Sequence, residues 1–191
     1  MKLRGRLLGL FGIVFAVVLC AFCFLMLRGS SERLDARAAT EFLVINEENQ
    51  DEYLNIQSNI LYGFKQAGDQ PVIQKDRRCV VILEIPDSVT EIGESAFAGY
   101  TNLYSVTLNS GINQIDATAF QGCVRLAEVC NQTKFEITAG GIEAGEVALH
   151  ALNVCSDKAA RTLIRNGDFV YCYNANAQTG ENEYKLVAYL G

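Results

Sequence analysis

The chain has 191 residues, half of them hydrophobic, and a formal net charge of −6, which allows one modest folded core besides other apolar segments. Residues 29–191 hold 12 of the 16 lysines and arginines and all 22 aspartates and glutamates, so the net charge of this part is −10. A surface this acidic repels phosphate backbones, which excludes nucleic acid as the expected partner.

The first predicted element is a membrane-spanning helix. Residues 7–27 (LLGLFGIVFAVVLCAFCFLML) contain no charge, and as a helix of roughly 31 Å, at about 1.5 Å per residue, they match the hydrocarbon core of a bilayer. Basic residues precede the run at Lys2, Arg4 and Arg6. By the positive-inside rule, residues 1–28 are therefore predicted to be a cytoplasmic tip and a transmembrane signal-anchor, with the rest of the chain extracytoplasmic at the cell surface.

The alternative interpretation of this segment is a cleaved signal peptide. Ala36-Arg37-Ala38 resembles a small-x-small cleavage site, and cleavage near Ala38 would release a secreted protein. However, the apolar run is longer than the roughly 7–15 residues of an ordinary signal peptide, and this site lies far beyond its end. The sequence favours the uncleaved anchor, and both interpretations place the remaining chain outside the cytoplasm.

A polar stalk and a short hairpin are predicted next. Residues 29–52 are polar and charged apart from an apolar patch at 42–45, which is typical of a stalk between a membrane and a domain. In YLNIQSNILYGFK (53–65), apolar residues recur near period two on both sides of the turn-prone Asn59. This pattern predicts a β-hairpin.

A repeat of 23 residues follows the hairpin: IGESAFAGYTNLYSV begins at Ile92, and IDATAFQGCVRLAEV begins at Ile115. A fixed period of roughly 20–30 residues indicates stacked supersecondary units. Each unit is expected to contain one strand of L-x-x-L-x-L spacing, whose alternate side chains enter the core. The Ala-Phe-x-Gly stretches are expected to form short helical turns in which the rings of Phe97 and Phe120 fill the coil.

We therefore predict an α/β repeat solenoid, namely a right-handed leucine-rich-repeat coil that is β-dominated with short helical turns and is preceded by one transmembrane helix. The leucine-rich-repeat domain, with its N-terminal β cap, is predicted to span residues 53–134. No third Ala-Phe-x-Gly motif follows, so residues 135–191 are predicted to be a degenerate capping or spacer unit with a short helix at 143–154 and a β-hairpin. Because no polar segment closes the solenoid after Tyr189, we expect the natural chain to continue beyond Gly191.

The stretch LEIPDSVTEIGESAFAGYTNL (83–103) resembles the repeat unit of BspA-type leucine-rich-repeat surface proteins. The resemblance is tight over residues 80–130 and loose over 53–191. It departs from the family pattern at Asp116, where Gly is usual, and at Asn131 on the third strand. The resemblance implies a secreted or surface-anchored protein, and because some members are implicated in adhesion or in binding host proteins, it also implies a binding function.

The sequence predicts no catalytic, metal or cofactor site. The single histidine, His150, lacks the partners of a metal site or a catalytic triad. The glycine-rich AGGIEAG (139–145) lacks the Lys and Ser/Thr of a phosphate loop. Cys123 is expected to fill the core. The five cysteines beyond the apolar run show no C-x-x-C spacing and are expected to be free buried thiols, with one or two disulfides left open: Cys79, Cys123, Cys130, Cys155 and Cys172.

The predicted function is that of a membrane-anchored, extracytoplasmic leucine-rich-repeat protein that acts in protein or cell-surface binding and adhesion and is not an enzyme. The alternative is a structural spacer that presents a missing C-terminal domain, which could be catalytic. Asn131-Gln132-Thr133 is an N-x-T sequon, so Asn131 is a glycosylation acceptor if the organism glycosylates. A ligand is expected on the concave strand face, whose outward positions are Glu84, Tyr104, Ser105, Thr107 and Glu128.

Overall fold

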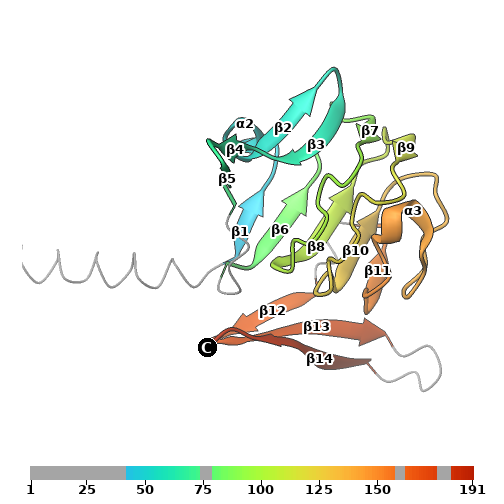
Figure 1. Ribbon diagram of the computed structural model, residues 1–191. Coiled ribbons are helices and arrows are strands. Elements are labelled where there is room, and N and C mark those ends of the chain that lie inside the picture. The colour runs from blue at the N-terminus through green and yellow to red at the C-terminus, as the bar shows by residue number, and fades with distance from the viewer. Residues whose placement is uncertain (1–41, 74–78, 158–161, 176–181) are drawn as a thin grey trace, which may run out of the picture. The chain divides into compact units, whose positions relative to one another are not determined.

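Successive repeats contribute one short strand each to a parallel sheet, here called the main sheet. The computed structural model describes residues 42–73, 79–157, 162–175 and 182–191, all within the unit Phe42–Gly191. Among these residues the main sheet has five parallel strands in the order β1-β6-β8-β10-β11 (Figure 1). Their bounds are β1 (Leu43–Ile45), β6 (Val81–Glu84), β8 (Leu103–Leu108), β10 (Glu128–Asn131) and β11 (Asn153–Cys155).

The 23-residue repeat is confirmed by the register of these strands. Glu84 of β6 pairs with Thr107 of β8, and Ser105 of β8 pairs with Glu128 of β10, so each partner lies 23 residues further along the chain. The repeat seen in the sequence is therefore one coil of a β-solenoid.

The same coils form a second sheet, called the convex sheet, in the order β2-β3-β7-β9. The predicted hairpin is confirmed within it, because β2 and β3 pair antiparallel through a turn at Ser58 and Asn59. Their φ angles of +51° and +67° are the left-handed pair that a type I′ turn requires. β3 also pairs in parallel with β7, so the hairpin caps the first coil. The bounds are β2 (Leu54–Gln57), β3 (Ile60–Phe64), β7 (Glu91–Ile92) and β9 (Gln114–Ile115).

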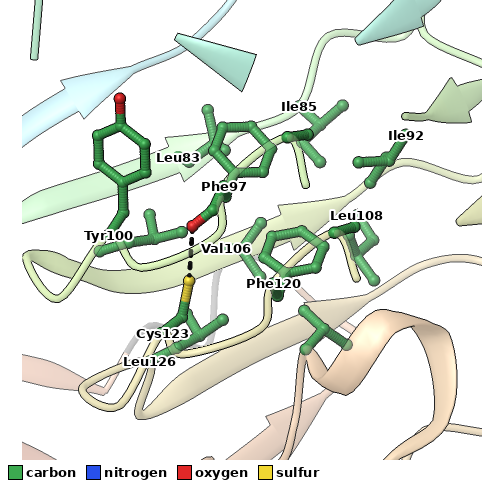
Figure 2. Close-up of a cluster of buried hydrophobic side chains, with 14 of the residues drawn as sticks. Leu83, Ile85, Ile92, Phe97, Tyr100, Val106, Leu108, Phe120, Cys123 and Leu126 are labelled. Atoms are coloured by element: carbon green, nitrogen blue, oxygen red, sulfur yellow. Dashed lines mark hydrogen bonds between the residues drawn. The ribbon is translucent and has the colours of Figure 1, made fainter. Parts of the chain in front are cut away.

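Apolar side chains fill the space between the main and convex sheets. The rings of Phe97 and Phe120 stack with centroids 5.3 Å apart and planes at 20°, and both are almost fully buried (Figure 2). The thiol of Cys123 donates a hydrogen bond of 3.0 Å to the carbonyl oxygen of Phe97. The predictions that Phe fills the coil and that Cys123 fills the core are confirmed. The strand residues that pack around the rings are Leu83, Ile85, Val106, Leu108 and Leu126.

The predicted helical turns are wrong. The Ala-Phe-x-Gly stretches form non-helical turns, which Gly99 and Gly122 leave with φ of +72° and +76°. Among the described residues the helices are only α2 (Gln50–Tyr53) and α3 (Glu143–Glu146), and left-handed φ at Ala144 and Gly145 interrupts α3. Because each convex segment is so short, turns suffice to close the coil, and the fold is a β-solenoid with little helix.

A third coil follows where the sequence predicts only a degenerate unit. The helix predicted at 143–154 is present only as the short α3, and the end of the predicted range forms strand β11, which continues the main sheet. The amide of Phe120 donates to the carbonyl of Gly145, just as that of Phe97 donates to the carbonyl of Ala119. This coil escapes a search for a 23-residue repeat because β10 and β11 are offset by 25 residues and because Glu146, rather than a Phe, comes directly after Gly145.

The solenoid also begins earlier than expected. Residues 42–52, which the sequence assigns to the stalk, are part of the folded unit, since Leu43 of β1 pairs with Val81 and Ile45 is fully buried. Residues 29–41 and the predicted anchor at 7–27 lie outside the described residues. No helix in the part of the chain that the structure describes is long and apolar enough to cross a membrane.

Two further hairpins complete the described chain. β4 (Gln66–Ala67) and β5 (Gln70–Pro71) form a two-stranded antiparallel ribbon. β12 (Leu163–Asn166), β13 (Phe169–Ala175) and β14 (Asn182–Tyr189) form an antiparallel sheet in that order, here called the terminal sheet. The predicted C-terminal hairpin is confirmed as β13–β14, with β12 added at its edge.

Candidate functional site

The face of the main sheet that points away from the Phe97 and Phe120 rings was expected to bind a ligand, and we keep the name concave face for it. The terminal sheet covers much of this face (Figure 1). Tyr104, Ser105 and Glu128 are at most 1% exposed. The prediction that these three side chains are open to a ligand is wrong. The apolar residues that join the two sheets are Val80, Ile82, Tyr104, Ala127, Leu163, Val170, Cys172, Ala188 and Leu190.

Glu128 fastens the terminal sheet to the concave face. One carboxylate oxygen accepts a hydrogen bond of 2.8 Å from the hydroxyl of Ser105. The other accepts one of 2.6 Å from the backbone N–H of Thr162 and another from the Thr162 hydroxyl. Thr162 immediately precedes β12, so these bonds hold the start of the terminal sheet. A buried carboxylate with three donors is stable because each bond compensates for lost hydration.

Tyr104, the aromatic residue expected to contact a ligand, is instead an internal packing residue. Its ring lies in the apolar layer between the two sheets, and its hydroxyl accepts a hydrogen bond of 3.3 Å from the Arg125 guanidinium. The L-x-x-L-x-L spacing correctly directs Tyr104 away from the core, and the pairing of β6 with β8 is irregular at this point. The spacing does not show whether the side chain on that face meets solvent or a second sheet.

The remaining two predicted positions, Glu84 and Thr107, lie beside a pocket of about 240 Å³ at the carboxyl ends of the main-sheet strands. Thr107 is buried and Glu84 is half-buried. Four carboxylates line the pocket, which therefore suits an ammonium or guanidinium group. No group of three or more residues in the described ranges has the arrangement of a metal site. The pocket is lined by Asn46, Glu47, Glu48, Glu84, Ile85, Asp87, Thr107, Asn109 and Gln132.

A contiguous apolar surface lies on the far side of the terminal sheet. Along β13, Val170 and Cys172 point to the concave face, so their neighbours point outward. Cross-strand register pairs Tyr171 with Leu186 and Tyr173 with Tyr184, which places these side chains on the same outward side. We call this surface the aromatic face; its residues are Ile164, Phe169, Tyr171, Tyr173, Tyr184, Leu186 and Tyr189.

Rings on the aromatic face contact one another while remaining open to solvent. The centroid of Phe169 lies 5.1 Å from that of Tyr189 and 6.4 Å from that of Tyr171, and Tyr173 and Tyr184 are 5.7 Å apart. Tyr184, Leu186 and Tyr189 are each more than half exposed. Soluble proteins seldom expose apolar residues as a contiguous patch unless the patch binds something. The sequence contains a signal for this surface, because β13 begins with five successive apolar or aromatic residues (FVYCY). Such a run is typical of a strand whose two faces are both apolar.

A family model described as "BspA type Leucine rich repeat region (6 copies)" matches residues 77–142. This region is a BspA-type leucine-rich repeat. No curated protein and no solved structure matches the chain. The expected family is therefore confirmed, and the matched range extends into the third coil. Proteins built from such repeats are typically binding scaffolds.

Both departures from the BspA-type pattern have a local structural reason. Asp116, where the pattern has Gly, accepts hydrogen bonds from the N–H and hydroxyl of Thr118, and these bonds lower its pKa. Asn131 accepts from the N–H and hydroxyl of Thr133 and donates to the carbonyl of Phe135, which turns the chain after β10. Glycosylation of Asn131 stays a prediction, and it would require the amide to leave this turn.

The cysteines in the described part of this BspA-type chain are free thiols. Burial raises the pKa of Cys130 to about 12 and that of Cys172 to about 11. Such thiols are mostly protonated at neutral pH, so they react slowly with reagents in solution. His150 is exposed, and no metal-holding group of side chains is found in the described ranges.

Proposed function

We propose that this chain is a membrane-anchored, extracytoplasmic protein-binding module without a catalytic role, and that its partner docks on the aromatic face. The observation that carries this proposal is the contiguous surface formed by the exposed Phe169, Tyr184, Leu186 and Tyr189 with the half-buried Tyr171 and Tyr173. The alternative docking surface, the concave face, is largely covered by the terminal sheet.

The composition of the aromatic face favours a protein partner. Tyrosine and other aromatic residues are enriched at the centres of protein interfaces, where they bury large areas at low cost in side-chain entropy. The surrounding chain is acidic, with a net charge of −10 over residues 29–191. A complementary partner therefore has an apolar centre and a basic rim.

The N-terminal segment supports the location. Residues 7–27 are long and apolar enough to span a bilayer, and basic residues precede them. An anchor of this kind holds the repeat unit at the outer side of the membrane, where a surface partner is accessible. Protease treatment of intact cells tests this part, because protection of residues 42–191 from the protease contradicts the outward topology.

The docking surface is tested by site-specific photo-crosslinking on intact cells. A photoreactive amino acid replaces Tyr184 on the aromatic face or, as the control, Val124, which is an isolated apolar residue of equal exposure (54% and 53%). We expect a discrete crosslinked protein from position 184 that is absent at position 124. The same crosslink is expected to disappear when Leu186→Lys is added, because a charge at the centre of an apolar interface opposes docking by a basic-rimmed partner.

Equal crosslinking from positions 184 and 124, or none from either, contradicts docking on the aromatic face. The second of these results favours the spacer function, in which the visible surfaces bind nothing. A crosslink that persists with Leu186→Lys but disappears with Glu84→Lys would instead place the partner at the acidic pocket.

A further inference from the structure

Two cysteines on neighbouring strands of the main sheet stand directly opposite each other. In the parallel register of β10 and β11, Cys130 pairs with Cys155. Val129 and Val154, which precede them, pack towards the core. Both thiols therefore point to the concave face, since alternate residues of a strand face opposite sides.

The spacing of this pair suits a disulfide. Neighbouring strands lie about 4.7–4.9 Å apart, which falls within the range of about 4.4–6.8 Å between the Cα atoms of bonded cysteines. The two thiols are already hydrogen-bonded to each other. The third thiol of this region, Cys172, instead contacts the carbonyl of Ala127 and the hydroxyl of Thr162, each at 3.6 Å. Cys172 therefore belongs to the contact between the terminal sheet and the main sheet.

We propose that Cys130 and Cys155 are a dithiol that closes to a disulfide and joins the last two strands of the main sheet. The oxidant is a second disulfide, either a small molecule such as oxidised glutathione or a protein disulfide. Cys155 is half-buried and Cys130 is 3% exposed, so the thiolate of Cys155 attacks the external disulfide and displaces one thiolate. The thiolate of Cys130 then attacks the sulfur of Cys155 and displaces the second. Two S–H bonds are lost, one S–S bond forms, and the oxidant leaves as two thiols.

The consequence for the fold follows from the place of β11. This strand has three residues and stands at the end of the main sheet, paired with β10. A short edge strand frays easily, because few hydrogen bonds hold it. A disulfide between residues 130 and 155 closes a loop that contains the whole third coil, which restricts the unfolded chain and stabilises the end of the solenoid.

The test uses the purified full-length chain, reduced and then equilibrated with oxidised glutathione. Remaining thiols are blocked with iodoacetamide, the protein is digested, and the peptides are identified by mass spectrometry. We expect one linked peptide pair that contains Cys130 and Cys155 and is lighter by two hydrogen atoms than the separate peptides. The variant Cys155→Ser is expected to abolish this pair, and the control Cys79→Ser is expected to retain it.

Recovery of Cys130 and Cys155 as separately alkylated peptides, as glutathione adducts or in bonds to other cysteines would overturn the proposal. A second measurement does not depend on the variants folding. The urea midpoint of the oxidised wild-type chain is expected to exceed that of the reduced chain and to return when reductant is added. Identical midpoints for the linked and reduced chains would contradict the stabilising role of the bond.

Discussion

The attachment of the terminal sheet depends on one carboxylate, and its removal is the most informative perturbation of this structure. Glu128→Ala deletes the acceptor of three hydrogen bonds, one from Ser105 and two from Thr162. The Ser105 and Thr162 hydroxyls can rotate to other acceptors, but the backbone N–H of Thr162 cannot. Leaving a buried donor unsatisfied costs about 1–3 kcal/mol, and bonds to a charged acceptor contribute about 1.5–3 kcal/mol each. Since removing the carboxylate also removes its own desolvation cost, we expect a net loss of about 2–4 kcal/mol in the free energy of unfolding.

A double-mutant cycle isolates the bond between Glu128 and Thr162. Thr162→Val removes the hydroxyl and keeps the side-chain shape, so the cycle with Glu128→Ala is expected to give a coupling energy of about 1.5–3 kcal/mol in urea denaturation of the reduced full-length chain. Hydrogen exchange of the same variants is expected to accelerate in β12 and β13 and to remain slow in β6 and β8. The control is Glu91→Ala, because Glu91 accepts its hydrogen bond from Gln114 at an exposed site.

Two results refute this reasoning. A coupling energy below about 0.5 kcal/mol, which is the ordinary error of additivity, shows that the two residues act independently. Uniform acceleration of exchange across both sheets shows that Glu128 supports the whole fold rather than the attachment of the terminal sheet.

Two further predictions concern a glycine and the buried thiols. Gly63→Ala is expected to destabilise the fold strongly, since Gly63 has φ of +106° and an added Cβ would lie 1.9 Å from a backbone carbonyl oxygen of the first coil. The control Gly68→Ala, at φ of +64° with no atom within 4 Å of the added Cβ, is expected to cost only about 1–2 kcal/mol. Equal urea midpoints for the two variants contradict the close approach. Stability of the reduced chain is expected to be constant up to about pH 9 and to fall as the pH rises towards 11–12, because burial raises the pKa of Cys130 and Cys172 from 9.0 to about 12 and about 11 and the unfolded chain therefore loses its thiol protons first. The double variant Cys130→Ala/Cys172→Ala, compared by urea denaturation at several pH values, is expected to show a shallower fall, and an unchanged pH profile contradicts the assignment.

The features that the sequence predicts correctly are those encoded by local periodicity. The rings of Phe97 and Phe120, the turn at Asn59 and the 23-residue register each follow from residues close together in the chain. The third coil was missed because two extra residues shift its strand and because Glu146 stands where the Phe of the repeat is expected. Strand β1 was missed because Leu43 pairs with Val81, which lies 38 residues away across a hairpin and a ribbon.

The candidate site shows a different limit of sequence reasoning. The L-x-x-L-x-L spacing assigns Tyr104, Ser105 and Glu128 to the face opposite the core, and the structure agrees. What covers that face depends on residues 162–190, whose contribution is a long-range contact that no local pattern encodes. The run of apolar and aromatic residues that begins β13 indicates that both sides of this strand are apolar. Only the structure shows which side is buried against the main sheet and which forms the aromatic face.

The terminal sheet also fixes the number of coils. Val44 on the first strand of the main sheet and Leu152 at the entrance to the last both pack against the apolar cluster that joins the two sheets, so this cluster extends across the array. Open solenoids gain and lose repeats readily because each repeat contacts only its neighbours. Here a 23-residue unit inserted between β10 and β11 would widen the main sheet by one strand spacing, about 4.8 Å, and would move Thr162, which follows β11, away from Glu128. Duplication of a repeat, the usual route by which such arrays lengthen, is therefore blocked in this chain unless the terminal sheet changes with it.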